Sequence, residues 1–299
     1  MSMQIKPFDA KSSDITSIIS GFSAMGGTAR ELHAGCRLAL DMVRDDECTR
    51  LLSISGPAVA IGLKKLFIYS VNKGWFGTII TSGANIVHDL VDAHGGRHYI
   101  AQPGEPDALF RKKNFGRIGN IVIDMNDFAK VERTLARVLA PLDGRQIGIS
   151  ELLDAIGAKL PKGSLLRACH DKKVKVYSPG FQDSMLGLHL IFARKKPVID
   201  AISDMPSLAN KIYDSKRIGA LMLGGGIPKH FAMGSTVLKE GLDYAVNITT
   251  GVEYDSSLSG AGLSEGISWK KVKGKYATIH GDYSILFPLL YTYLSANLK

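Results

Sequence analysis

The sequence is poor in cysteine and has no long apolar run. Its three cysteines, Cys36, Cys48 and Cys169, are scattered, and none belongs to a C-x-x-C pair. This pattern argues against a disulfide framework and a structural zinc site, and it favours a reducing, cytoplasmic setting. Since no run of about 18 apolar residues occurs, we expect no membrane-spanning helix. The first ten residues also lack an apolar stretch, so we expect no signal peptide.

Charged residues make up only 22% of the 299-residue chain, and hydrophobic residues make up 45%. These proportions exclude a disordered, collagen-like or coiled-coil protein. Lysine and arginine exceed aspartate and glutamate, and the formal net charge is +9. The basic residues form small separate clusters at residues 111–113, 194–196 and 270–275. Because nucleic-acid binding needs a basic stripe or a known module, we expect no nucleic-acid partner.

Short apolar segments recur along the chain, and helical patterns follow most of them. The predicted strands are residues 51–55, 77–81, 174–177, 218–223 and 276–279. The predicted helices are residues 58–71, 86–93, 151–158, 206–216, 228 onward and 283–294. Such alternation is typical of a mostly parallel sheet with helices on both faces. We therefore predict a doubly wound, Rossmann-like α/β fold.

The sequence contains no low-complexity linker, so we predict one integrated domain over residues 1–299. Within it, residues 1–45 are expected to form a small helical cap. Residues 14–41 have the pattern of two helices that separate at Gly26 and Gly27.

Glycine and serine gather where the predicted strands end. These loops contain Gly56, residues 82–85, Gly180, residues 224–226 and residues 281–282. Open parallel sheets bind ligands outside the carboxyl ends of their strands. Glycine lets the backbone approach a ligand, and the N-terminus of a following helix offers N–H groups to phosphate. The loops therefore suggest a nucleotide site. None is a G-x-G-x-x-G fingerprint or a P-loop, so plain strand–helix turns remain an alternative.

The C-terminal third carries a more specific pattern. Its segments are Leu-Gly-Gly-Gly-Ile-Pro-Lys-His at 223–230, Asp-Tyr-Ala-Val at 243–246, Glu-Tyr-Asp-Ser-Ser-Leu-Ser-Gly at 253–260, Ser-Trp-Lys-Lys at 268–271 and Phe-Pro-Leu-Leu at 287–290. Residues 81–89, 117–120 and 178–183 add to it. In order and spacing, these segments closely resemble the deoxyhypusine synthase family over roughly residues 14–294.

This resemblance implies an NAD-dependent aminoalkyl transferase. The family uses NAD and spermidine, a polyamine, to move an aminobutyl group onto one lysine of the hypusine-containing translation initiation factor. An enzyme lysine holds the group as an imine, and it corresponds to Lys271. The histidine that assists deprotonation of this lysine corresponds to His230. The resemblance also implies a homotetramer whose active sites are shared between subunits.

The chemistry of the surrounding residues agrees with these roles but does not establish them alone. Lysine becomes nucleophilic when desolvation or nearby positive charge favours its uncharged form. We expect Trp269 to supply an apolar wall, and Lys270 and Lys273 to supply charge. Glu265 suits the ammonium end of an amine substrate. Without the family pattern, a lysine in so basic a run is typically solvated, and a histidine after glycines is typically structural.

The resemblance also assigns residues to NAD. They are Thr81, Ser82, Gly83, Asp183, Gly224, Gly225, Gly226, Asp255, Ser257, Ser259, Gly281 and Asp282. Each of these residues, taken singly, is also compatible with an ordinary turn. We predict no metal site, because no matching carboxylate pattern accompanies His88, His94 and His98.

Four positions depart from the family's pattern, and one of them is Val87, where the family has a glutamate. Leu188 and Leu258 stand where the family has aspartates, and Gly234 stands where it has an asparagine. Burying an unpaired ammonium against leucine is costly. We therefore expect Leu258 and Gly234 to lie at a substrate site whose amine donor differs from spermidine, such as an agmatine-like molecule.

Three alternatives to a deoxyhypusine synthase are considered. A homospermidine synthase-like enzyme would use the same lysine chemistry with a small amine as acceptor. A catalytically silent regulatory paralogue is also open, although Lys271 and His230 argue against it. An NAD-dependent deacylase would need a zinc site built from C-x-x-C pairs, which this sequence lacks.

Overall fold

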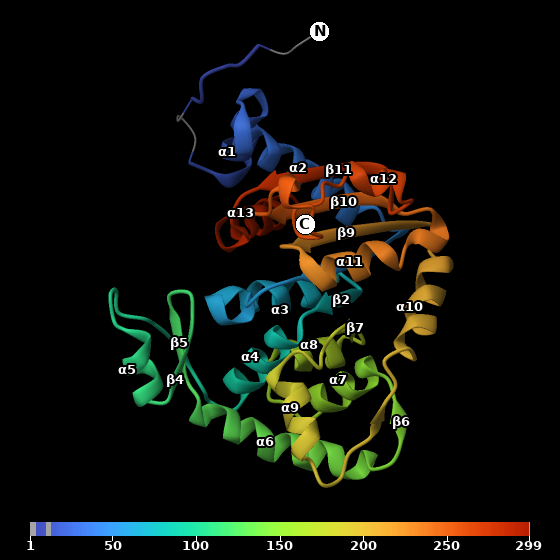
Figure 1. The fold of residues 1–299 in the computed structure, drawn as a ribbon. Coiled ribbons are helices and arrows are strands. Elements are labelled where there is room, and N and C mark those ends of the chain that lie inside the picture. The colour runs from blue at the N-terminus through green and yellow to red at the C-terminus, as the bar shows by residue number, and fades with distance from the viewer. Residues whose placement is uncertain (1–3, 10–12, 299) are drawn as a thin grey trace. The chain divides into compact units, whose positions relative to one another are not determined.

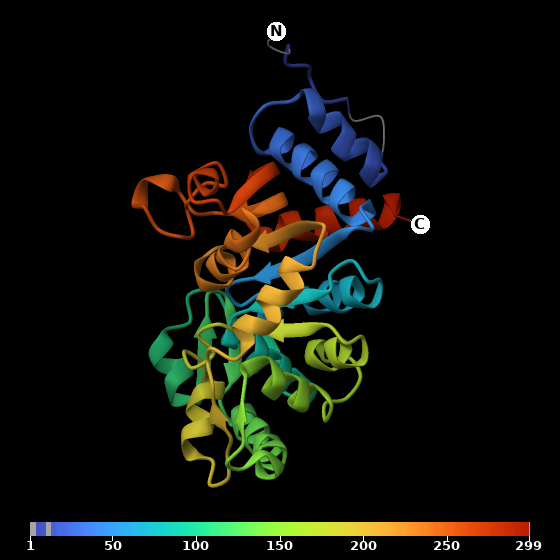
Figure 2. The ribbon, with the colours of Figure 1, turned by 90° about the vertical axis from the view of Figure 1, so that its right-hand side faces the viewer.

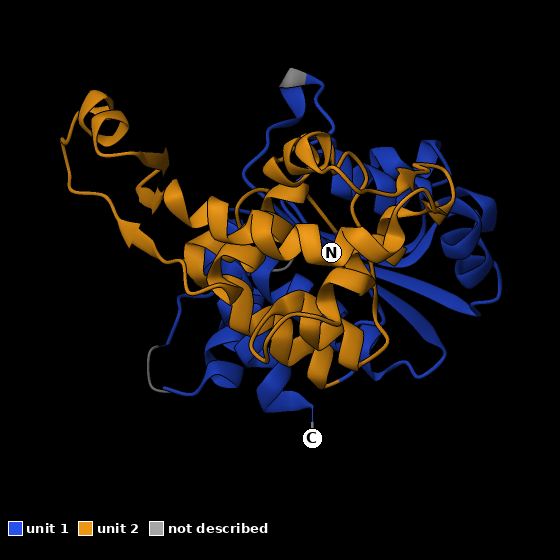
Figure 3. Ribbon diagram, turned by 90° about the horizontal axis from the view of Figure 1, so that it is seen from below, with its two compact units in different colours: residues 1–55, 74–80, 205–299 blue, residues 56–73, 81–204 orange. Residues whose placement is uncertain are grey.

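The computed structural model describes residues 4–9 and 13–298 (Figures 1 and 2). The chain forms two compact units (Figure 3). The first unit comprises residues 1–55, 74–80 and 205–299, and the second comprises residues 56–73 and 81–204. The single integrated domain expected from the sequence stays a prediction.

The main sheet has six strands in the order β11-β10-β9-β1-β2-β7. Its strands are β1 (Cys48–Ile54), β2 (Thr78–Thr81), β7 (Lys175–Tyr177), β9 (Arg217–Leu223), β10 (Leu242–Thr249) and β11 (Val272–His280). The pairs β1–β9, β9–β10 and β10–β11 are all parallel. This arrangement confirms the predicted mostly parallel α/β fold. Strand β10 was not predicted, because its residues 243–246 were interpreted only as part of a family motif.

Helices cover both faces of the strands in the first unit, which explains why β9 is apolar along almost its whole length. Helices α2 (Gly27–Arg44) and α13 (Tyr283–Asn297) lie on one side, and α11 (Gly226–Gly234) lies on the other (Figures 1 and 2). A Cβ atom added to Gly35 of α2 would lie 2.4 Å from Ile279 Cδ1 of β11. Glycine therefore lets this helix pack closely on the sheet.

The N-terminal helices agree with the predicted pair. Helix α1 (Ile15–Gly21) is capped by Asp14, whose carboxylate accepts a hydrogen bond of 2.9 Å from Ser17 N. A short 3-10 turn, Phe22–Ala24, follows it. Gly27, with φ of +64°, then begins α2. Of the predicted cap, residues 1–3 and 10–12 lie outside the described residues.

The second unit contains a three-stranded antiparallel sheet that the sequence analysis did not predict. Its strands are β3 (His98–Ile100), β4 (Phe115–Ile118) and β5 (Ile121–Asp124), in the order β3-β5-β4. Two further short strands, β6 (Gln146–Ile147) and β8 (Val198–Ile199), pair in parallel. The helices of this unit are α3 (Lys64–Asn72), α4 (Gly83–Ala93), α5 (Asp107–Lys112), α6 (Asn126–Leu139), α7 (Ile149–Gly157), α8 (Leu165–Asp171) and α9 (Met185–Phe192).

Some predicted helices are confirmed with different bounds. The helix expected at residues 58–71 is interrupted at Gly62, whose φ of +99° lies inside a π turn (Val59–Leu63) that directly precedes α3. Helix α4 begins at Gly83 rather than at residue 86. Helix α10 (Asp204–Tyr213) corresponds to the predicted residues 206–216. No helix within the described ranges has both the length and the apolar character needed to cross a membrane.

Candidate active site

A cavity of about 290 Å³ lies in the first unit. It is lined by Lys229, His230, Met233, Leu258, Ala261, Gly262, Glu265, Gly266, Trp269 and Lys271. These residues come from α11, the loop after β10, α12 (Glu265–Ser268) and the residues just before β11. The structure thus brings together five predicted site residues that are far apart in the sequence. The sixth, Gly234, ends α11 directly after Met233 and is not among the described residues that line the cavity.

Lys271 and His230 face each other in this cavity. Lys271 Nζ lies 3.4 Å from His230 Nε2. The same ammonium group lies 5.5 Å from the centre of the Trp269 ring, a distance typical of a cation–π contact. The tryptophan is therefore placed as the apolar wall that the sequence analysis expected.

The backbone of Lys271 is held between α12 and β10. Its amide N–H donates a hydrogen bond of 2.8 Å to Gly266 O, and its carbonyl accepts one of 3.0 Å from Leu242 N. Gly241, with φ of +111°, packs directly against the Lys271 carbonyl: an added Cβ would lie 2.5 Å from Lys271 C. This glycine is needed both for the backbone conformation and for the close approach. The start of the lysine side chain is thus fixed by the sheet.

The environment of His230 favours its neutral form. Desolvation lowers the pKa of His230, and the nearby positive charge of Lys271 lowers it further. The imidazole is therefore mostly uncharged at neutral pH, and one ring nitrogen can then accept a proton. A neutral imidazole beside an ammonium group is the arrangement required of a base that deprotonates a lysine.

Lys270 and Lys273, which were expected to supply positive charge, both have acidic partners. Lys270 Nζ lies 3.8 Å from a carboxylate oxygen of Glu240. Lys273 Nζ donates to Lys239 O at 3.0 Å, and it also lies 3.5 Å from a carboxylate oxygen of Asp243. Neither is among the described residues that line the cavity, and the expectation stays a prediction.

Lys229 is the buried cation at the cavity, and the sequence analysis missed it. Its residue is 2% exposed, and its Nζ donates a hydrogen bond of 2.6 Å to Ala261 O. Desolvation lowers the pKa of Lys229, and the negative charge of Glu265 opposes this shift. Its place beside His230 in the Gly-Gly-Gly-Ile-Pro-Lys-His segment was the signal that could have found it.

Other predicted cofactor residues of the first unit pack around the triple glycine. Gly224 and Gly226 have φ of +76° and +62°, and the three glycines join β9 to α11. A Cβ atom on Gly225 would lie 2.3 Å from Ser259 Cα, so the loop with the two serines lies against this turn. In the same loop, Ser257 Oγ accepts a hydrogen bond of 3.2 Å from Gly260 N. Asp255 ends the short 3-10 turn Glu253–Asp255.

Gly281 and Asp282 occupy a second turn of this kind, between β11 and α13. Gly281 has φ of +155°. Asp282 is the N-cap of α13, and its carboxylate accepts a hydrogen bond of 2.7 Å from Ser284 N. The predicted role of this aspartate in cofactor binding therefore coexists with a clear structural role as a helix cap.

The four cofactor residues predicted in the second unit also lie near one another. Thr81 ends β2, and Ser82 is the N-cap of α4. A Cβ atom on Gly83 would lie 2.5 Å from Ser184 Oγ, so the start of α4 lies against the turn that carries Asp183. Asp183 itself is exposed. The structure therefore forms one cluster of predicted cofactor residues within each unit.

The first unit has features that suit a dinucleotide phosphate. Helix α11 begins at Gly226, immediately after a parallel strand, so its free N–H groups point toward the carboxyl end of the sheet. A Cβ atom on Gly226 would meet no described atom within 4 Å, which leaves this helix start open to a ligand. The residues present thus fit the predicted NAD.

The three histidines considered for a metal have protein partners instead. His88 Nδ1 lies 2.9 Å from His98 Nε2, and His98 Nδ1 lies 3.0 Å from a carboxylate oxygen of Asp92. His94 contacts Leu90 O and Thr134 Oγ1, both at 2.6 Å. Across the part of the chain that the structure describes, no three His, Cys, Asp or Glu side chains are grouped to hold a metal ion.

Comparisons with known proteins show the family of the chain. The deoxyhypusine synthase family model matches residues 17–294. A protein named probable deoxyhypusine synthase from Methanopyrus kandleri is 43% identical over 266 residues, which cover 88% of this chain and 87% of the relative. The chain belongs to the deoxyhypusine synthase family. Another probable deoxyhypusine synthase, from Methanothermobacter thermautotrophicus, is 36% identical over 277 residues, which cover 90% of this chain and 90% of the relative.

Solved structures support the same fold. A crystal structure from Entamoeba histolytica that is assigned to the deoxyhypusine synthases has a TM-score of 0.64 at 16% identity, and it covers 99% of this chain and 98% of that one. The structure of AgrE with ornithine and NAD+ has a TM-score of 0.56 at 13% identity, covering 91% of this chain and 34% of that one. The family and fold predicted from the sequence are therefore confirmed.

Proposed function

We propose that this member of the deoxyhypusine synthase family transfers an aminobutyl group, in an NAD-dependent reaction, from a polyamine or related amine to a lysine of a translation initiation factor precursor. The observation that carries the proposal is the 3.4 Å approach of Lys271 Nζ to His230 Nε2 beside Trp269. A lysine beside a neutral histidine and an aromatic wall is suited to attack an imine.

In this reaction NAD, when bound, supplies the oxidation of the amine donor to an imine and the later reduction of the product. His230 accepts the proton that Lys271 Nζ must lose before it attacks the imine carbon. Lys271 then forms its own imine as the donor's remaining amine leaves. The acceptor lysine displaces Lys271 by the same exchange, so no net change occurs at the enzyme. Trp269 covers the alkyl chain and keeps water from hydrolysing the imine.

We assign NAD to the glycine- and serine-containing turns of the two units. In the first unit these are Gly224, Gly225, Gly226, Asp255, Ser257, Ser259, Gly281 and Asp282. In the second unit they are Thr81, Ser82, Gly83 and Asp183. The support is the parallel strand that runs directly into α11 at Gly226, where backbone N–H groups can receive phosphate.

The donor amine is proposed to place one cationic end in the cavity. Of the ten described residues that line it, only Glu265 carries a carboxylate, and Leu258 supplies an apolar wall. A second buried ammonium would therefore have no partner. We expect Leu258→Asp to raise kcat/KM for spermidine by about tenfold or more relative to agmatine, because the new carboxylate offers the missing partner. An unchanged ratio between the two donors would contradict this assignment.

The test combines the chain with NAD, a labelled amine and purified precursor of the factor. The proposal predicts label on one lysine of the factor and a borohydride-trapped adduct on Lys271, located by mass spectrometry. Label found only in small molecules would instead indicate a homospermidine synthase-like enzyme. No adduct and no transfer would indicate a silent paralogue. The homotetramer and the cytoplasmic location stay predictions, and light scattering of the purified chain checks the first.

A further inference from the structure

Lys229 carries a positive charge into the interior of the first unit. The residue is 2% exposed, and it follows the triple glycine on α11, directly before His230. Burial of an ammonium group is costly unless hydrogen bonds and opposite charge compensate it. Here the compensation comes from Ala261 O, 2.6 Å from Nζ, and from the negative charge of Glu265. This cost indicates that the positive charge of Lys229 has a role that a neutral side chain could not fill.

The carbonyl that Lys229 holds belongs to a folded-back loop, residues 250–262. Within the loop, a Cβ atom on Gly260 would lie 1.8 Å from Val252 O, so its two arms touch along the backbone. The loop provides Leu258, Ala261 and Gly262 to the cavity and leads directly to Glu265. Its position therefore decides where one wall of the cavity stands.

Among the described residues, Ser259 and Lys229 connect this loop to the segment that carries His230. Ser259 lies against Gly225 at the turn before α11, and this is a van der Waals contact. Lys229 Nζ donates to Ala261 O, which is a directional, charge-assisted contact from α11 itself. Because Lys229 and His230 are neighbours on the same helix, the second contact links the wall of the cavity to the histidine.

We infer that Lys229 is a positioning residue, whose ammonium group fixes the wall formed by residues 258–265 relative to the Lys271–His230 pair. Its function is to hold Leu258 and Glu265 where they bind the amine donor. It neither carries the aminobutyl group nor accepts the proton of Lys271. This inference rests on the proposed function for its kinetic consequences, and on the structure alone for the attachment of the loop.

The test replaces Lys229 with methionine, which keeps most of the length of the side chain and removes its charge. We expect the KM for the amine donor to rise by about tenfold or more while kcat stays within about threefold, because binding is disturbed and the Lys271–His230 pair is not. Lys229→Arg should restore KM to within about threefold of the original value, since a guanidinium can also donate to the carbonyl.

The matched control is Lys239→Met. Lys239 Nζ also donates to a backbone carbonyl at 2.6 Å, that of Ser215, in the same unit, but Lys239 is not among the described residues that line the cavity. Its KM for the amine donor should stay within about twofold of the original value. Hydrogen exchange adds a readout that needs no activity: residues 250–265 should exchange faster in Lys229→Met than in the original chain or in Lys239→Met.

Several results would overturn the inference. They are an unchanged KM in Lys229→Met, a loss of kcat with unchanged KM, a borohydride adduct on Lys229, and unchanged exchange in residues 250–265. If the original chain transfers no group at all, the proposed function fails. In that case the exchange measurement still decides whether Lys229 attaches the loop.

Discussion

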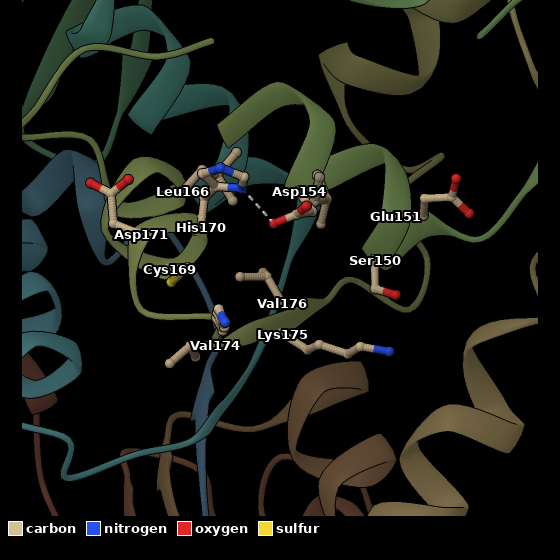
Figure 4. Close-up of a pocket in the computed structure, with 12 residues that line it drawn as sticks. Ser150, Glu151, Asp154, Leu166, Cys169, His170, Asp171, Val174, Lys175 and Val176 are labelled. Atoms are coloured by element: carbon tan, nitrogen blue, oxygen red, sulfur yellow. Dashed lines mark hydrogen bonds and ion pairs between the residues drawn. The ribbon is translucent and has the colours of Figure 1, made fainter. Parts of the chain in front are cut away.

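The candidate active site in the first unit and a larger cavity in the second unit differ in how their charges are paired. The cavity of the second unit is the larger, about 720 Å³ against about 290 Å³, and lies among α7, α8 and β7 (Figure 4). Its acidic groups have basic partners: Asp154 Oδ1 lies 2.8 Å from His170 Nδ1, Glu151 pairs with Arg145, and Asp171 pairs with Arg167. In the smaller cavity, Lys271 faces a histidine instead of a carboxylate.

This contrast bears on which cavity suits the proposed proton transfer. The paired groups of the larger cavity are opposite charges that attract each other. In the smaller cavity, the ammonium group of Lys271 faces a histidine that can accept a proton, and the carboxylate among the described lining residues belongs to Glu265. We therefore assign the proposed transfer chemistry to the smaller cavity, and the greater volume of the other cavity does not by itself favour that role.

The largest effect is expected from Lys271→Arg. Arginine keeps the positive charge but is not deprotonated in proteins, so it cannot attack an imine. Turnover should fall by roughly 10³-fold or more, and no borohydride-trapped adduct should form. The control is Lys270→Arg, whose side chain is 69% exposed beside Glu240 and which should keep its activity. Retention of turnover in Lys271→Arg would end the assignment of the smaller cavity as the active site.

The next effect is expected from His230→Gln. Loss of a proton acceptor should lower kcat by roughly 10²- to 10³-fold. Because the pKa of His230 lies below its ordinary value, kcat/KM of the original enzyme should be sustained at neutral pH and should fall only as the pH drops below about 6.5. The variant should lose this part of the pH profile. The matched control in the larger cavity is His170→Gln, and an equal loss there would erase the contrast between the cavities.

The fold shows which elements a sequence pattern can predict. Strand β9 was predicted because Ile218 to Leu223 are buried on both faces and therefore apolar without interruption. Strands β3 and β4 are three and four residues long and partly exposed, so their stability depends on antiparallel pairing with β5 rather than on a local pattern. Strand β5 has the buried apolar residues Ile121, Val122 and Ile123, but it is only four residues long. Helix α6 was missed although Phe128, Val131, Leu135 and Val138 recur at helical spacing, so its signal was present.

The site residues also divide into those that the sequence predicts and those that it does not. Lys271 and His230 came from the family motif, and the structure places them in contact. Lys229 was not predicted although it stands beside His230 in the motif, because lysine is normally solvated and its burial depends on a carbonyl 32 residues later in the chain. Lys270 lies near Glu240, and Lys273 near Lys239 O and Asp243, because the packing, rather than proximity in sequence, decides which way a long side chain extends.

A histidine of the second unit sharpens the comparison through stability rather than activity. His88 is 6% exposed, and burial lowers its pKa to about 4, with a further lowering by His98 and an opposing effect of Asp92. The fold therefore favours neutral His88, so its contribution to stability is complete above the ordinary pKa and is lost as the pH falls toward 4. We expect the titration of His88 to lower the free energy of unfolding by about 2 kcal/mol as the pH falls from 7 to 5.

Urea unfolding of the original chain and of His88→Asn at pH 7, 6 and 5 measures this contribution. The asparagine variant should show a smaller loss between pH 7 and 5, because it has no proton to gain at this position. If both proteins lose stability equally, His88 does not titrate as its buried position implies. Transfer activity at pH 7 should persist in the folded variant, in contrast to His230→Gln.

The smallest effect is expected from Asp154→Asn in the larger cavity. The side chains of Asp154 and His170 are 62% and 36% exposed, so solvent already screens their attraction. Removing the charge should change the free energy of unfolding by less than about 1 kcal/mol, which moves Tm by about 3 °C or less. Turnover should stay within about twofold, because no reacting group depends on this pair. A loss of about tenfold at unchanged Tm would show that the larger cavity takes part in the reaction, and the distinction between paired and unpaired charges would then not separate the two sites.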